Sequence, residues 1–310
     1  INGLMYKIRQ EQDKQKSSVV LTIDRRIQDI VEEAANRRLL KGAVVVMDVD
    51  SKDVLAIVSR PTFNPYQVAQ TSMEDAPLLN RALNRYYPGS LFKIAVAAAA
   101  LEEGITEPDE KFFCSGKYTM PDGFSIPCLR KSGHGKLTLS QAFALSCNPV
   151  FIEVGIRLGS ARLQSYARKM HLDQTQLIGY QVASYSGIKI DSGQRALANA
   201  SLGQQGVMMS PLQVCSMVAT IADSGKWSPP RLLRYTIDSS GQKIECPAAE
   251  KEQVISSQTA ALIQSMMEKV VGEGTAVSAA IPEAKVAGKT GTSQTGIFTG
   301  KDGEVLDAWF

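Results

Sequence analysis

The feature that most constrains the fold is an apolar run at residues 94–101, which follows the segment Tyr87-Pro88-Gly89. Proline and glycine interrupt any preceding helix, and Gly104 favours a helix end, so the sequence predicts a helix over residues 90–101. Its apolar side chains surround the axis on every side, which is typical of a helix buried at the centre of a domain. The rest of the chain must therefore cover this helix on all its faces.

The start of this helix carries the motif Ser90-Leu91-Phe92-Lys93. Side chains one helical turn apart lie on the same face, so Ser90 and Lys93 are expected to be neighbours. Burial disfavours the ammonium form of a lysine, and a neutral Lys93 could take the proton of the Ser90 hydroxyl. The alternative interpretation is a helix start followed by a lysine whose head reaches solvent, although a lysine in such an apolar helix is uncommon.

A second motif, Ser146-Cys147-Asn148, follows a predicted short helix. Thr138 and Gln141 have the spacing of a capping box, which indicates where that helix begins. Pro149 restricts the residue before it to an extended conformation, so the helix is expected to end at or just before Asn148. Ser146 and Asn148 would then lie at a helix-to-loop junction, where they either point into a cleft or form an ordinary polar terminus.

A third motif, Lys289-Thr290-Gly291-Thr292, follows a strand-like stretch. Its first residues match the end of a phosphate-binding loop, but Glu283 stands where that loop needs a glycine. The phosphate-binding interpretation therefore fails, and a strand end followed by a turn remains as the plain alternative.

The ordered set of Ser-x-x-Lys, Ser-x-Asn and Lys-Thr-Gly resembles the signature of penicillin-binding proteins and serine β-lactamases. The resemblance runs from about residue 19 to the end of the chain and is greatest to class B, monofunctional transpeptidases. The spacing of Cys114, Cys128, His134 and Cys147 is similar to that of division- and sporulation-type members. Further stretches that resemble the family are Leu21-Thr22-Ile23-Asp24, residues 42–48, residues 53–61, Gly203-Gln204 and Gly274-Thr275-Ala276.

The order of predicted elements indicates an α/β (α+β) fold, an antiparallel sheet flanked by helices. Its expected parts are a helix capped by Asp24, a hairpin of residues 43–49 and 53–59, a third strand at 284–290, and helices starting near Ser210 and Ser256. The resemblance implies an α/β subdomain of about residues 19–60 and 250–310 and a mainly helical subdomain of about 61–249. It also implies that residues 1–18 are a linker or the tail of an upstream pedestal domain, and that a further strand and helix follow residue 310.

The resemblance implies a role for each motif residue. Ser90 would be the acylated nucleophile, Lys93 its base, Ser146 a proton relay and Lys289 a source of positive field. Asn148, Thr290, Gly291 and Thr292 would bind the substrate, and the backbone N–H groups of Ser90 and Thr292 would form the oxyanion hole. No metal and no organic cofactor is expected.

The implied activity is a peptidoglycan D,D-transpeptidase that cross-links stem peptides and is inhibited by β-lactams. A β-lactamase would need a water activator, and no Glu-x-x-x-Asn element lies between the second and third motifs. A D,D-carboxypeptidase stays open, and so does a non-enzymatic β-lactam sensor or scaffold. A Ser-His-Asp hydrolase is disfavoured because no Gly-x-Ser-x-Gly elbow surrounds Ser90, and His134 between two glycines is expected to be a turn residue.

Expected partners are peptidoglycan stem peptides, β-lactams and other cell-wall synthesis proteins. The formal net charge is only +3 and no basic stripe is interleaved with aromatic residues, so no nucleic-acid partner is expected. The family implies the extracytoplasmic face of the bacterial membrane, reached through an N-terminal anchor upstream of Ile1.

Five cysteines, at positions 114, 128, 147, 215 and 246, form no Cys-x-x-Cys pair. An extracytoplasmic location permits disulfides, and Cys147 stands inside the second motif. We hypothesise a redox pair of Cys128 and Cys147 that holds this motif. The alternatives are a disulfide between Cys114 and Cys128, or free thiols.

Overall fold

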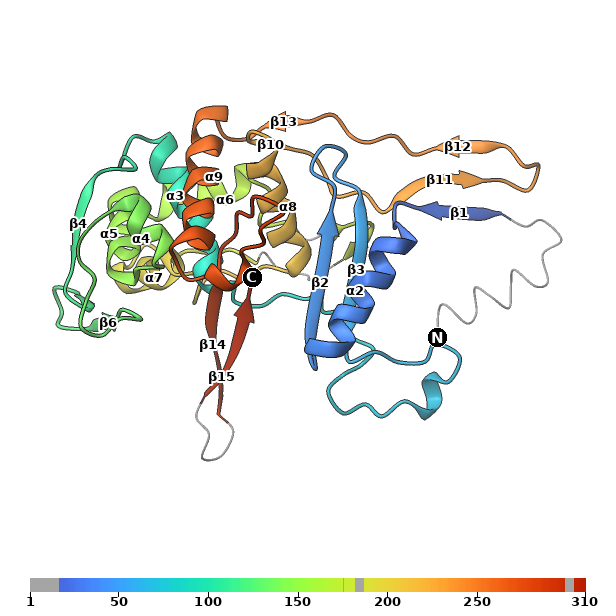
Figure 1. The fold of residues 1–310 in the computed structure, drawn as a ribbon, viewed down its shortest axis with the longest axis horizontal. Helices are drawn as coiled ribbons and strands as arrows, with labels where there is room; N and C mark the ends of the chain where they lie inside the picture. Colours follow the sequence, from blue (N-terminus) through green and yellow to red (C-terminus); the bar gives the residue numbers. More distant parts are fainter. Residues whose placement is uncertain (1–16, 175, 182–186, 299–303) are drawn as a thin grey trace.

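The computed structural model describes residues 17–174, 176–181, 187–298 and 304–310 (Figure 1). The predicted linker of residues 1–18 therefore lies outside the described residues except for its last two. Figure 1 shows the helices gathered around α3 (Lys93–Glu102) at one side, with the hairpin of β2 (Gly42–Met47) and β3 (Val54–Arg60) and helix α2 (Arg25–Arg38) beside them. No helix in the described ranges combines the length and the apolar character that a membrane crossing requires.

The central helix is present, but it begins as a 3₁₀ turn, Gly89–Phe92, and continues as α3, Lys93–Glu102. Every residue of α3 from Lys93 to Ala100 is buried. Its many alanines allow neighbouring helices to approach closely on every side. The helices that pack on it are α5 (Asn148–Leu158), α6 (Ser160–Lys169) and α9 (Ser257–Gly272).

Two capping boxes fix where helices begin, and the first of them confirms the prediction for Thr138 and Gln141. Thr138 N–H donates to Gln141 Oε1 at 2.8 Å, and Gln141 N–H donates to Thr138 Oγ1 at 3.2 Å, which starts α4 (Leu139–Ala144). Ser210 and Gln213 make the same pair of bonds at the start of α8 (Pro211–Ala222). Helix α7 (Gln194–Ser201) also belongs to the group of helices around α3.

The predicted hairpin is also confirmed, as β2 (Gly42–Met47) antiparallel to β3 (Val54–Arg60). Asp24 accepts the backbone N–H groups of Arg26 and Ile27 and so caps α2 (Arg25–Arg38). Helix α2 packs on β3 and helix α8 packs on β2. The hairpin is thereby held between a helix close to it in sequence and one from the helical part.

The predicted strand at residues 284–290 is wrong. The strand is β14 (Gly291–Phe298), which begins only within the third motif and pairs with β15 (Glu304–Trp309). Before it, Gly288 N–H donates to the carbonyl of Met267 at 3.2 Å, so the chain follows helix α9 instead of a strand. Among the described residues, β14–β15 and β2–β3 are separate two-stranded sheets. The general class of antiparallel strands with packed helices nevertheless stands.

The other strands are short, with two to five residues each. A three-stranded sheet has the order β1 (Ser18–Leu21), β11 (Leu233–Ile237) and β12 (Lys243–Glu245). The pairs are β4 (Lys111–Cys114) with β7 (Gly135–Thr138), β5 (Lys117–Thr119) with β6 (Ser125–Pro127), β8 (Gln176–Leu177) with β9 (Tyr180–Gln181), and β10 (Lys226–Trp227) with β13 (Glu252–Gln253). Two further 3₁₀ turns are Val68–Gln70 and Val277–Ala279.

Candidate active site

The turn that carries Ser90 is fixed by close backbone contacts. Gly89 has φ +55°, and a Cβ there would lie 2.5 Å from the carbonyl oxygen of Thr292. Its N–H donates to the carbonyl of Gly203 at 2.9 Å. Only glycine tolerates both the left-handed backbone and this approach. The turn therefore presents Ser90 directly beside strand β14.

Lys93 lies at the start of α3, and its side chain is fully buried. Its ammonium donates to the carbonyl of Ser146 at 2.9 Å, to Ser146 Oγ at 3.2 Å and to Asn148 Oδ1 at 2.8 Å. These three acceptors match the three protons of a charged lysine. In the neutral amine, the Ser146 hydroxyl is the one partner of the three that can reverse direction and donate to Nζ.

Ser146 joins the first and third motifs. Its Oγ accepts from Lys93 Nζ at 3.2 Å and from Lys289 Nζ at 3.1 Å, and the residue is 2% exposed. Its φ of +54° places it in the left-handed region, which is uncommon for a residue with a side chain. Such a conformation persists only where the surroundings hold it, and it often marks a functional site.

Both lysines are shifted toward the neutral amine. Burial lowers the pKa of Lys93 well below the usual 10.5, and the nearby charge of Lys289 lowers it further. Burial also lowers the pKa of Lys289, to about 7. The rings of Phe151 and Phe143 lie 5.5 Å and 5.7 Å from the two ammonium nitrogens and form part of the apolar surroundings. Both amines are therefore easier to deprotonate than an exposed lysine, which allows each of them to exchange a proton with Ser146.

Asn148 is the first residue of α5 and is half-buried. Its Oδ1 accepts from Lys93, and its Nδ2 donates to the carbonyl of Pro127 at 3.0 Å. The expectation that the helix ends before Asn148 is confirmed for α4, but the expected extended conformation of Asn148 is wrong, because helix α5 begins at Asn148 and has Pro149 in its first turn.

The third motif runs from the buried Lys289 onto the open edge of β14. Gly291 is buried, and a Cβ there would lie 2.8 Å from the carbonyl oxygen of Pro88. Thr292 is exposed, and the hydroxyl of Thr290 lies 2.5 Å from the hydroxyl of Thr275. The two threonine side chains therefore differ, since one is free for a ligand and the other already has a partner.

The structure thus brings the three motifs together around Ser146. Lys93, Ser146, Asn148 and Lys289 form one hydrogen-bonded cluster, and Ser90 lies one turn before Lys93. Within the ranges described above, the Ser90 hydroxyl has no hydrogen-bond partner of its own. A serine whose backbone is fixed but whose hydroxyl makes no hydrogen bond is free to rotate about its side-chain bond.

Sequence reasoning gave no role to Thr275, Pro127 or Gly203. Thr275 contacts Thr290, Pro127 anchors Asn148, and Gly203 supports Gly89. The stretches around Thr275 and Gly203 did resemble the family, which was the available signal. Pro127 acts through its carbonyl oxygen, for which a sequence gives no signal.

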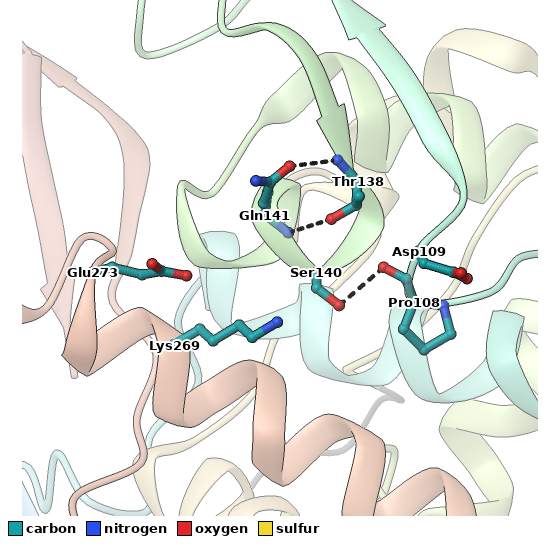
Figure 2. Close-up of a pocket in the computed structure, with 7 residues that line it drawn as sticks. All are labelled: Pro108, Asp109, Thr138, Ser140, Gln141, Lys269 and Glu273. Atoms are coloured by element: carbon teal, nitrogen blue, oxygen red, sulfur yellow. Dashed lines mark hydrogen bonds between the residues drawn. The ribbon is translucent and has the colours of Figure 1, made fainter.

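A pocket of about 400 Å³ lies between the start of α4 and the end of α9, and it contains no residue of the three motifs (Figure 2). Three of its polar residues are already used for local structure, since Thr138 and Gln141 bond each other and Ser140 Oγ donates to the carbonyl of Pro108 at 2.9 Å. We therefore assign no chemistry to this pocket.

The fold and the motif cluster agree with a comparison to known families. The model of the penicillin binding protein transpeptidase domain matches residues 42–310, and the chain belongs to this family. The family membership predicted from the three motifs is confirmed.

Individual relatives support the same conclusion. Stage V sporulation protein D of Bacillus subtilis is 33% identical over 301 residues, which are 93% of this chain and 45% of that protein. Peptidoglycan D,D-transpeptidase PbpA of Mycobacterium tuberculosis is 32% identical over 313 residues, with 92% of this chain and 62% of that protein covered. The chain thus spans about half the length of the curated relatives it matches.

Solved structures show the same architecture. The ceftriaxone acyl-enzyme complex of penicillin-binding protein A from M. tuberculosis has a TM-score of 0.82 at 27% identity, covering 99% of this chain and 74% of that one. The D,D-transpeptidase domain of a peptidoglycan glycosyltransferase from Eggerthella lenta has a TM-score of 0.81 at 28% identity, covering 94% and 75% of the two chains.

Proposed function

We propose that this chain is the catalytic domain of a class B peptidoglycan D,D-transpeptidase that cross-links stem peptides through a serine acyl-enzyme and is inhibited by β-lactams. The observation that carries the proposal is the convergence of Lys93 and Lys289 on Ser146 Oγ, next to the turn that presents Ser90. The similarity of the chain to a D,D-transpeptidase and to a ceftriaxone acyl-enzyme complex supports the proposal.

Acylation begins when neutral Lys93 takes the proton of Ser90 and the Ser90 oxygen attacks the carbonyl carbon of the D-alanyl-D-alanine bond. The developing oxyanion is stabilised by the backbone N–H groups of Ser90 and Thr292. Removing one such donor from an oxyanion hole typically costs about 3 kcal/mol of transition-state stabilisation. The closeness of Gly89 to Thr292 supports this pairing of the turn with strand β14.

Collapse of the intermediate breaks the C–N bond and needs a proton on the departing D-alanine nitrogen. Ser146 donates that proton and regains one from Lys93 or Lys289, both within hydrogen-bonding distance. An amine of a second stem peptide then attacks the ester of the acyl-enzyme, which forms the cross-link and releases Ser90.

Substrate binding uses the groups around this cluster. The exposed Thr292 and the hydroxyl of Thr290 bind the substrate carboxylate, and Gly291 lets the substrate backbone run along β14. Asn148 Nδ2 binds a substrate carbonyl when it leaves the Pro127 carbonyl. Lys289 contributes positive potential beside the carboxylate.

The proposal also covers the cellular location of the enzyme and the division of the chain into subdomains. The enzyme acts on the extracytoplasmic face of the membrane, with the longer protein supplying a membrane anchor and a pedestal, and it works beside other cell-wall synthesis proteins. Within the chain, residues 19–60 and 250–310 form the α/β subdomain and residues 61–249 the mainly helical one.

Treatment with penicillin tests the proposed function. Intact-mass measurement should show one stable adduct on the wild type and none on Ser90→Ala, while Ser240→Ala, at an exposed hairpin turn, should keep the adduct. An adduct that persists on Ser90→Ala would refute the nucleophile, and rapid loss of the adduct with penicillin hydrolysis would indicate a β-lactamase.

A donor stem peptide with an acceptor amine then separates the remaining alternatives. A cross-linked product supports the transpeptidase, and hydrolysed donor as the sole product supports a carboxypeptidase. Stable acylation by penicillin without turnover of any stem peptide would point to a sensor.

A further inference from the structure

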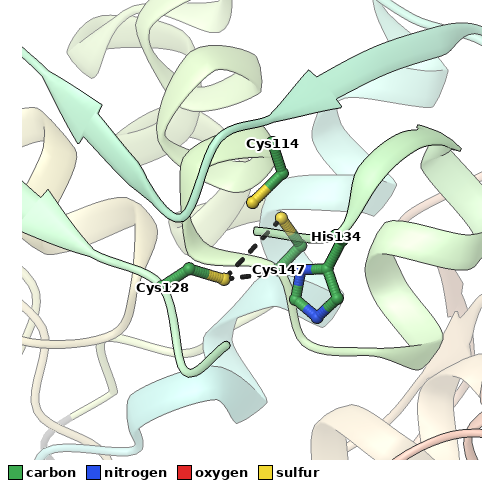
Figure 3. A group of neighbouring side chains, drawn as sticks. All are labelled: Cys114, Cys128, His134 and Cys147. Carbon is green, nitrogen blue, oxygen red and sulfur yellow. Dashed lines mark hydrogen bonds between the residues drawn. The ribbon is translucent and has the colours of Figure 1, made fainter. Parts of the chain in front are cut away.

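Three buried thiols and one imidazole converge beside the active site (Figure 3). Cys114 ends β4, Cys128 directly follows β6, His134 directly precedes β7, and Cys147 caps α5. Their ligand atoms all lie within 4.8 Å of one another, and Figure 3 shows all four side chains turned toward one point. Four metal-ligating groups from four separate segments seldom meet in a core without a reason.

The distances between these atoms fit a tetrahedral metal site. Zinc bonds of about 2.3 Å to sulfur and about 2.0 Å to nitrogen give tetrahedral edges of about 3.8 Å between sulfurs and about 3.5 Å between sulfur and nitrogen. The Cys128 and Cys147 sulfurs are 4.0 Å apart, and Cys128 Sγ lies 3.5 Å from His134 Nδ1. The sulfur–sulfur distance is far longer than the bond of about 2.0 Å in a disulfide.

The backbone around the cluster is built to bring these groups together. Cys128 N–H donates to the carbonyl of Gly116 at 2.8 Å. Gly116 and Gly133 have positive φ, and a Cβ at Gly133 would lie 2.3 Å from the carbonyl oxygen of Cys114. Two glycine turns therefore let the loops that carry Cys114, Cys128 and His134 pack closer than any side chain would allow.

Backbone N–H groups support the sulfurs of the cluster. Those of Asn148 and Arg130 are directed at the sulfur of Cys128, and that of Val150 is directed at the sulfur of Cys147. N–H groups directed at ligand sulfurs are the supporting contacts that metal sites use.

We propose that Cys114, Cys128 and Cys147, through Sγ, and His134, through Nδ1, bind one Zn²⁺ in a closed tetrahedral site. Three thiolates and an imidazole are a ligand set of structural zinc sites, which leave no position open for water. The three cysteines are buried in the core, so such an ion stabilises the fold and takes no part in the chemistry.

The site departs from what the sequence led us to expect, which was no metal and a turn role for His134. The five cysteines are free thiols in the structure, and the Cys128–Cys147 pair stays a prediction. Zinc and that disulfide exclude each other because they use the same sulfurs. Zinc would hold Cys147 between Ser146 and Asn148, so it positions the second motif and the left-handed conformation of Ser146.

Metal analysis of the chain purified under reducing conditions, after dialysis against a weak chelator, tests the proposal. We expect one zinc per chain in the wild type, and retention of that zinc in the matched control Cys246→Ser, which lies outside the cluster. Cys114→Ser and His134→Ala should each lose most of it. Absence of tightly bound zinc from the reduced wild type, or full retention in both ligand variants, would overturn the proposal.

Cobalt substitution of the wild type keeps the test decisive if the ligand variants fail to fold. We expect intense visible absorption of tetrahedral Co²⁺ together with thiolate charge-transfer bands, and their loss on adding one equivalent of Zn²⁺. A weak octahedral spectrum would refute the site. Penicillin acylation of Ser90 at the unchanged wild-type rate after zinc removal would refute the positioning role and leave the proposed function standing, whereas an at least tenfold slower acylation would support that role.

Discussion

Lys289 is a residue at which charge and burial conflict directly. Burial lowers its pKa to about 7 from 10.5, so between these pH values the unfolded chain binds more protons than the folded one. Stability therefore rises with pH through this window, and the whole cost of burying the ammonium is present below pH 7. Lys289→Met removes the cost, and we expect it to raise the free energy of unfolding at pH 6 by a few kcal/mol, on the order expected for such a shift.

Urea denaturation at pH 6 and pH 10 measures this effect. The advantage of Lys289→Met should shrink at pH 10, while its acylation by penicillin is slowed at both. Lys285→Met is the control, because that side chain is 77% exposed and should change stability little at either pH. An equal stability difference at the two pH values would contradict the buried-charge explanation.

Among the individual residues, part of the site could be predicted from the sequence, because acyl transfer by a serine requires particular residue types. Ser90, Lys93, Ser146, Asn148 and Lys289 stand at spacings that a serine acyl-transfer site requires, so motifs found them. Thr275 and Pro127 could not be found in this way, because their roles arise only when α9 and the β5–β6 hairpin fold against the motifs. The proximity of Cys114 and His134 could not be predicted from the sequence either, because the folding of the loops brings them together.

Among the elements, the 3₁₀ turn before α3 depends on the loop after α7. Gly203 has φ +68°, and a Cβ there would lie 2.0 Å from the carbonyl oxygen of Gly89. Gly104 has nearly the same backbone, φ +61°, with nothing within 4 Å of its would-be Cβ. Gly104→Ala should cost only the left-handed strain of about 1 kcal/mol. Gly203→Ala should cost at least twice as much and displace Ser90.

Thermal unfolding and the rate of penicillin acylation should be measured on both variants. Together they separate the effect of left-handed backbone strain from the effect of the contact between Gly203 and Gly89. We expect Gly203→Ala to acylate more than tenfold more slowly and Gly104→Ala to acylate at the wild-type rate. Equal rates in the two variants would show that the Gly89–Gly203 contact does not position the nucleophile.

The helices were the most predictable elements because their signals are local. Asp24, Thr138 and Ser210 cap the helices they were expected to cap, and the bonds they make span only a few residues. The strand predicted at 284–290 failed because a short apolar stretch does not reveal its partner. The carbonyl of Met267 on α9 takes the N–H of Gly288, and strand pairing starts three residues later.

Across the whole molecule, buried ion pairs join the two proposed subdomains. Lys52, which is fully buried in the β2–β3 turn, donates to Asp223 Oδ2 at 2.8 Å after the end of α8. Next to it, Asp53 accepts both arms of the Arg231 guanidinium, at 2.5 Å and 2.9 Å. Separating the parts would leave these charges unpaired, which costs several kcal/mol for a buried pair.

The two subdomains should therefore unfold together, and the two tryptophans can report on each of them. Trp227 belongs to the helical part and Trp309 to the α/β part. In Trp227→Phe and in Trp309→Phe, we expect the urea midpoint from the remaining tryptophan to coincide with the midpoint from far-UV circular dichroism. Fluorescence midpoints that depart from the circular dichroism midpoints in opposite directions in the two variants would show that the parts unfold separately.

The pair of lysines on Ser146 has a consequence for how a ligand is captured. At neutral pH and without a ligand, the site carries less than its full positive charge, because burial in the apolar core keeps Lys289 partly deprotonated. In the proposed function a carboxylate binds at Thr290 and Thr292 and makes the ammonium form of Lys289 favourable again, so we expect the complex to take up a proton from solvent as it forms. Affinity for acidic ligands then declines with increasing alkalinity, and each binding event delivers the proton that the departing amine will need.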